Sequence, residues 1–162
     1  MKKYSWIIIL ANLLLFLGYF NYSVVLKEKL LEEGTLVFME LAPVDPRSLM
    51  QGDYMELQYK LPSDMAFDNI PPRGFCAISP DASGVVRHIR FLTDGRKVKQ
   101  NELPVRYTKR KWWGIHIGAD SYFFQEGDAE KYGNAKYGGI RVDGEGNSLL
   151  IGLYDDNLKK LE

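Results

Sequence analysis

The chain has 162 residues, and its 21 basic residues balance its 21 acidic residues, so the formal net charge is zero. This balance argues against a generic polyanion-binding protein, which would carry a clear basic excess. The length allows one domain of about 100 to 150 residues and a short attachment, which argues against a two-domain enzyme. A single cysteine, Cys76, excludes an intramolecular disulfide and a structural zinc site built on thiolates.

An uncharged run of 23 residues lies near the N-terminus, at positions 4–26. As a helix this run would be about 34 Å long, slightly more than the ~30 Å hydrocarbon core of a bilayer. Aromatic residues near both ends fit the belts found at membrane interfaces: Trp6 at one end and Tyr19, Phe20 and Tyr22 at the other. We therefore expect residues 4–26 to lie in the lipid bilayer.

A cleaved signal peptide and a buried core helix are the alternatives to an uncleaved anchor. No small-residue cleavage site follows the apolar run, and the sequence continues into a helical pattern that Gly34 can stop. Lys2 and Lys3 precede the run, although Lys27 and Lys29 match them in number at its other end. The short tail and the long following domain favour a single-pass protein with its C-terminal domain outside the cytoplasm.

After Gly34 the hydrophobic pattern changes to the two-residue alternation of half-buried strands. A helix is expected only at 128–138, and the turn at 143–147 joins two alternating segments as a hairpin. We predict a mainly β fold, in which one transmembrane helix carries a small antiparallel β barrel or sandwich with one short helix. We expect the chain to consist of two parts, a membrane anchor helix with its extension at 1–34 and a β domain at 35–162. The expected strands are 35–41, 54–61, 74–80, 85–92, 104–108, 112–118, 139–143 and 148–155.

One motif resembles a known family. It consists of Gly52, Asp53, Tyr54, Leu57 and Tyr59, preceded by the sequence DPRSLMQ. These residues resemble the naming motif of the GDYXXLXY family of bacterial membrane-anchored proteins. A second region, 123–153, is similar to the C-terminal half of that family, with Gly139 where an acidic residue is more usual.

The resemblance implies a single-pass protein of the bacterial cell membrane or envelope with no characterised activity. Related sequences occur beside or fused to multi-helix membrane domains, so it also implies a multi-helix membrane protein as one candidate partner. It implies no cofactor.

The motif itself predicts a turn followed by an amphipathic strand. Gly52 permits a positive φ, and the Asp53 carboxylate can accept backbone hydrogen bonds in the turn. Alternation then points Met55, Leu57 and Tyr59 to one side. The alternative is a direct binding or catalytic role for Asp53 and for the neighbouring Tyr54.

Ser48 is the weak candidate for a catalytic residue, in a Ser/Lys hydrolase related to signal peptidases. The spacing from Ser48 to the Gly-Asp pair is too short for those enzymes. Lys97 and Lys99 are the candidate bases, and each would need to be buried to serve. The competing interpretation is a serine that caps a turn.

Metal binding has little support in the sequence. The two histidines, His88 and His116, each fall in an alternating strand without a second ligand at short spacing, so a polar strand face is expected. The DGEGN segment at 143–147 has acidic or amide side chains at alternate positions. It lacks the glycine and the bidentate glutamate of a calcium loop, which leaves a hairpin turn.

A basic segment next to tryptophans is a candidate contact for the membrane or for an anion. It consists of Lys109, Arg110, Lys111, Trp112 and Trp113. Its three cations end a basic middle third, 73–111, which has 10 basic and 3 acidic residues. Cations beside indole rings suit a lipid surface. The alternative is a strand edge whose tryptophans enter the core.

The function that we expect from the sequence is therefore a non-catalytic accessory or interaction module for another membrane protein or for the envelope surface. The alternatives are the hydrolase at Ser48 and a domain that binds anions or an envelope polymer. Nucleic acid is not expected as a partner, because the net charge is zero and the domain should be exterior.

Overall fold

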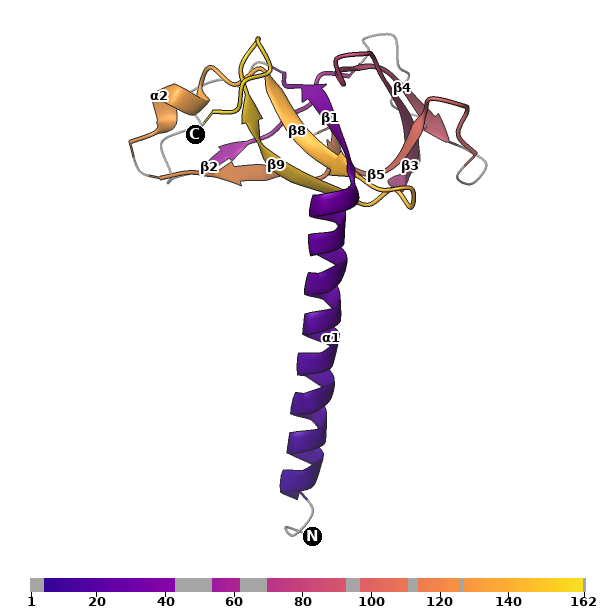
Figure 1. The fold of residues 1–162 in the computed structure, drawn as a ribbon, viewed down its shortest axis with the longest axis vertical. Helices are drawn as coiled ribbons and strands as arrows, with labels where there is room; N and C mark the ends of the chain where they lie inside the picture. The colour runs from indigo at the N-terminus through magenta and orange to yellow at the C-terminus, as the bar shows by residue number, and fades with distance from the viewer. Residues whose placement is uncertain are drawn as a thin grey trace.

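The computed structural model describes residues 5–42, 54–61, 70–92, 97–110, 114–125 and 127–161. A long helix leads into a β domain, and the figure shows the helix projecting below that domain (Figure 1). In chain order the elements are α1 Ser5–Glu33, β1 Thr35–Glu40, β2 Tyr54–Glu56, β3 Arg73–Pro80, β4 Val86–Leu92, β5 Leu103–Arg110, β6 Gly114–Ile117, β7 Ser121–Phe123, α2 Ala129–Tyr132, β8 Tyr137–Val142 and β9 Ser148–Tyr154.

The strands pair antiparallel in three groups, in the orders β1-β8-β9, β2-β7 and β4-β3-β5-β6. The sheet as a whole forms a half-barrel. The expected mainly β fold with one N-terminal apolar helix is confirmed. The predicted hairpin is confirmed as well, because β8 and β9 pair across the turn at 143–147.

Helix α1 is long and apolar enough to cross a membrane, and none of its apolar stretch is buried in the structure. It touches the domain only through its last turns, where Leu30 is 8% exposed. The helix ends at Glu33, directly before Gly34, as expected. Glycine is required at position 34, because a Cβ there would collide with the carbonyl oxygen of Leu30. Strand β1 begins at the next residue, so helix and domain are joined without a linker.

Arg141 on β8 ties this junction together. Its Nη1 donates to the carbonyl oxygen of Gly34 at 2.6 Å and approaches that of Glu32 at 3.5 Å. Cations near the last carbonyls of a helix also interact favourably with its dipole. The β domain is therefore held at the helix end by a charged hydrogen bond as well as by the chain itself.

The core lies between the sheets, where alternate strand positions bring their apolar side chains together. Cys76 is fully buried, and this burial raises the pKa of its thiol to about 12, so the thiol is a packing group. The most deeply buried large side chains are Tyr107, Met39, Leu57, Ile78, Ile117, Ile140, Leu153, Val37, Val105 and Val142.

Several details differ from the sequence predictions. The strand expected at 54–61 covers only Tyr54–Glu56, because it pairs with the three residues of β7, and beyond it Tyr59 forms an isolated bridge to Leu41. The short helix covers only Ala129–Tyr132 within the expected 128–138, because β8 already begins at Tyr137. Strand β7, Ser121–Phe123, was not predicted: its three residues are too few to show alternation, and it forms because it pairs with β2.

Candidate functional site

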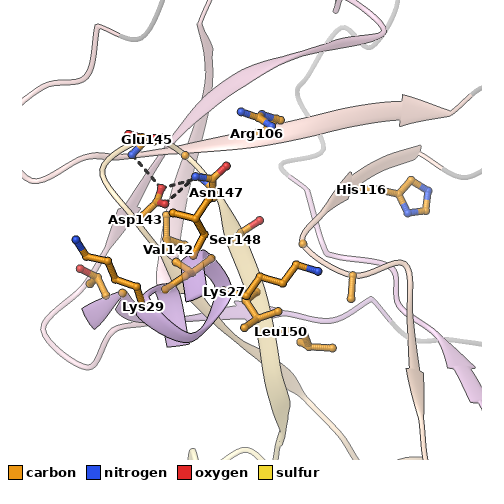
Figure 2. Close-up of a pocket in the computed structure, with 18 of the residues that line it drawn as sticks. Lys27, Lys29, Arg106, His116, Val142, Asp143, Glu145, Asn147, Ser148 and Leu150 are labelled. Atoms are coloured by element: carbon orange, nitrogen blue, oxygen red, sulfur yellow. Dashed lines mark hydrogen bonds between the residues drawn. The ribbon is translucent and has the colours of Figure 1, made fainter. Parts of the chain in front are cut away.

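A groove lies beneath the β domain, where α1 enters it, and has a volume of about 1270 Å³ (Figure 2). Segments far apart in the sequence form it: the end of α1 and the start of β1 from Ser23 to Thr35, the β6–β7 region from His116 to Phe123, and the β8–β9 turn with its flanks. Arg73 on β3 and Arg106 and Thr108 on β5 complete the lining. The groove is polar as well as apolar, and it is the candidate site that the described residues offer.

The β8–β9 turn is the rigid wall of this groove. The Asp143 carboxylate accepts hydrogen bonds from the backbone amides of Glu145 at 2.9 Å and Asn147 at 2.8 Å, and from the Asn147 side-chain amide at 2.8 Å (Figure 2). Gly146 supplies the positive φ of 85° that the turn needs. The Asp143 oxygens are thus occupied by the turn, in agreement with a hairpin.

His116 and Asp120 form a pair on another wall. The His116 side chain is only 10% exposed, and its Nδ1 lies 3.0 Å from the Asp120 carboxylate without the alignment of a hydrogen bond. Figure 2 shows His116 across the groove from the Asp143 turn. The turn at Gly118, with φ of 73°, brings the pair together. Sequence reasoning did not predict this pair, because an i,i+4 spacing across a strand and a turn carries no recognisable pattern.

The end of α1 lines the remaining side with both apolar and charged residues. Leu26 and Leu30 face the groove, and Figure 2 shows Lys27 and Lys29 leaving the helix in different directions. Lys29 Nζ lies 3.7 Å from the Glu33 carboxylate, an exposed i,i+4 pair of small energetic value. The groove therefore presents cations and carboxylates side by side instead of a single sign of charge.

No described residue of the family motif lines this groove, although β2 pairs with β7, which does. Leu57 is 1% exposed and Tyr59 is 5% exposed, so both are core residues, which confirms the predicted inward face. The Tyr59 hydroxyl has no hydrogen-bond partner among the described residues, and burial raises its pKa. The backbone of Tyr54 begins β2, whereas Gly52 and Asp53 lie outside the described residues.

The basic and aromatic segment is described only at its start. Lys109 is partly buried on β5, and its Nζ donates to the carbonyl oxygen of Ile70 at 3.4 Å. The backbone of Arg110 ends β5, and Lys111, Trp112 and Trp113 lie outside the described residues. The membrane or anion contact predicted here stays a prediction.

The candidate catalytic residues are not brought together in the described part of the chain. Ser48 lies outside it, and Lys97 and Lys99 are both exposed between β4 and β5. An exposed lysine lacks the desolvation that would make it a base. The hydrolase reading at Ser48 stays untested.

The two histidines lie in different places. His88 is exposed on β4, as expected for a polar strand face, whereas His116 is mostly buried at the groove. Across the described ranges, no group of three or more histidine, cysteine, aspartate or glutamate side chains is placed to hold a metal ion.

Comparison with protein families decides what the chain is similar to. The family model described as GDYXXLXY protein matches residues 16–153, from within α1 to the last but one residue of β9. The chain belongs to the GDYXXLXY family. No curated protein and no solved structure matches this GDYXXLXY protein. Because the match begins inside α1, the junction between helix and domain is part of the shared pattern.

Proposed function

We propose that this GDYXXLXY protein is a single-pass membrane protein of the bacterial cell envelope. Its β domain would serve as a non-catalytic module that binds another membrane protein at the bilayer surface. The observation that carries this proposal is the junction of α1 with the domain. A fully exposed apolar helix passes into a folded domain without a linker, and Arg141 holds the joint.

The length of the helix sets the height of the domain above the bilayer. The uncharged run ends at Leu26, and the seven residues from Lys27 to Glu33 rise about 10 Å. The headgroup layer on each side of a bilayer is about 5 to 8 Å thick. The lower face of the domain would therefore lie just outside the headgroups, and the groove, which extends down α1 to Leu26 and Ser23, would reach through the headgroup layer to the edge of the hydrocarbon.

The proposed orientation places the short N-terminal tail in the cytoplasm and the β domain outside. Lys2 and Lys3, which precede the uncharged run, support this assignment.

Binding of an anionic polymer is the weaker alternative, because two arginines of the basic middle third already form ion pairs with carboxylates. Arg87 pairs with Asp81 at 2.8 Å, and Arg90 pairs with Glu102 at 2.6 Å. These pairs neutralise two of the cations that such a ligand would require.

Purification of the intact protein from detergent-solubilised native membranes tests the proposal. The chain would carry a tag after Glu162, and an unrelated single-pass protein with the same tag would be the control. We expect one membrane protein to co-purify specifically and in comparable amount, with wild type and with Ser48→Ala alike. A chain that purifies alone would contradict the proposal. Loss of cellular function in a folded Ser48→Ala variant would instead favour the hydrolase.

A further inference from the structure

Asn12 is an amide in the middle of the apolar run of α1. It lies three residues, or about 4.5 Å along the axis, from Leu15 at the centre of positions 4–26. Its side chain is exposed, and no described residue hydrogen-bonds to it. An amide carries two N–H donors and an acceptor oxygen, and hydrocarbon can satisfy none of them. Asn12 therefore needs a partner that lipid cannot provide.

Asn21 is an amide in the same helix that does have a hydrogen-bond partner within the chain. Its Nδ2 donates to the carbonyl oxygen of Leu17 at 2.8 Å. Nine residues separate Asn21 from Asn12, and at about 100° per residue the two lie on opposite sides of α1. The unpartnered amide thus belongs to one face of the helix only.

That face leads directly to the groove beneath the β domain. Residues that follow one another at spacings of 7, 4, 3 and 4 lie on the same side of a helix. We use the name Asn12 face for the side of α1 that carries Asn12, Tyr19, Ser23, Leu26 and Leu30. Its last three residues line the groove, Ser23 is partly buried, and Leu30 is buried against the domain. A helix packed along this face would end in the groove.

We propose that a transmembrane helix of another membrane protein packs along the Asn12 face, hydrogen-bonds to Asn12 and ends in the groove. This inference rests on the proposed function and names the contact that would provide it. Interhelical hydrogen bonds from asparagine are a recognised means of association in membranes. The mixed charges of the groove, which Lys27 and Asp120 both line, suit the polar end of such a helix.

A second copy of this chain fits the face less well. Each copy passes from Glu33 to β1 through Gly34 alone, so a parallel second helix on the Asn12 face would carry its own β domain into the groove region. A helix that ends in the headgroup layer brings no such bulk. The occupant is therefore expected to come from a different protein.

Photo-crosslinking of the full chain in native membranes tests this contact. A photoreactive phenylalanine analogue would replace Tyr19 on the Asn12 face or, as the control, Leu10, nine residues away on the opposite side. We expect an adduct at position 19 that maps to a transmembrane segment of another protein, and none at position 10. An adduct to a second copy of this chain, or to lipid alone, would overturn the inference.

Substitution of the two asparagines provides an independent readout. Asn12→Leu should lower both the position-19 adduct and the amount of co-purified partner about three- to thirtyfold, whereas Asn21→Leu should leave both nearly unchanged. Unchanged melting of the β domain would show that neither variant unfolds it. If a partner co-purifies equally with wild type and Asn12→Leu, the inference fails while the proposed function stands. If no partner co-purifies with wild type, both fail.

Discussion

The sheet that carries α1 and the four-stranded sheet are stabilised in different ways. In the sheet of β1, β8 and β9, backbone comes close to side chains: a Cβ on Gly139 would lie 2.3 Å from the Tyr154 ring, which packs edge-on against Phe38. In the sheet of β4, β3, β5 and β6, alternating apolar residues are buried and exposed arginines pair with carboxylates. The first sheet should tolerate few substitutions, as a rigid mount for the helix requires, whereas the second should tolerate them at its exposed positions.

The largest effect is expected at Gly139. Gly139→Ala places a methyl group inside the contact distance of the buried Tyr154 ring, and such overpacking should lower the free energy of unfolding by about 2 to 3 kcal/mol. Gly144→Ala is the matched control, because nothing lies within 4 Å of its Cβ position, and it should cost less than about 0.5 kcal/mol. Denaturant unfolding of the solubilised chain measures both. Equal stability of the two variants would contradict the comparison.

An intermediate effect is expected at Arg141. Arg141→Met keeps the apolar stem but removes the hydrogen bond to the Gly34 carbonyl, which should cost about 1 to 2 kcal/mol for a partly exposed charged donor. It should also broaden the distribution of distances between spin labels on α1 and the domain. Arg73→Met, at an exposed arginine on the same side of the domain, is the control. A distribution as narrow as in wild type would show that Arg141 does not hold the joint.

The smallest effect is expected at Asp81 in the four-stranded sheet. The Ser83 hydroxyl and then Arg87 hold the pKa of this carboxyl well below its usual range near 4. Its contribution to stability is therefore present above about pH 4 and is lost as the pH falls further. Asp81→Asn should melt slightly below wild type at pH 7, and the two melting curves should converge toward pH 2. A difference that grows on acidification would contradict this assignment.

Much of the fold followed from periodicity. The switch at Gly34 from an uncharged run to alternation predicted the helix and most strands, and the turn at 143–147 predicted the hairpin, although not its register. The inward positions of Leu57 and Tyr59 also followed from alternation. Strand β7 could not be found, because a three-residue strand depends on its partner and not on its own pattern.

The candidate groove was not accessible to sequence reasoning. It forms where the end of α1, the His116–Asp120 pair and the β8–β9 turn meet, and only the tertiary fold brings these segments together. One signal was present in the sequence: Asn12 interrupts a run of apolar residues at a depth where an amide has no solvent. Leu57 and Tyr59 of the motif are core residues, as their alternation predicts.

The most direct test of the account is the state of α1 in the cell membrane. Intact cells with a permeabilised envelope would first be treated with or without external protease. Their membranes would then be washed with alkaline carbonate, and the mass of the retained protein would be measured. We predict that the chain is retained in the membrane, that it still contains Trp6, and that external protease cleaves the β domain. A soluble product that lacks the residues before Lys27, or a domain protected from external protease, would contradict it.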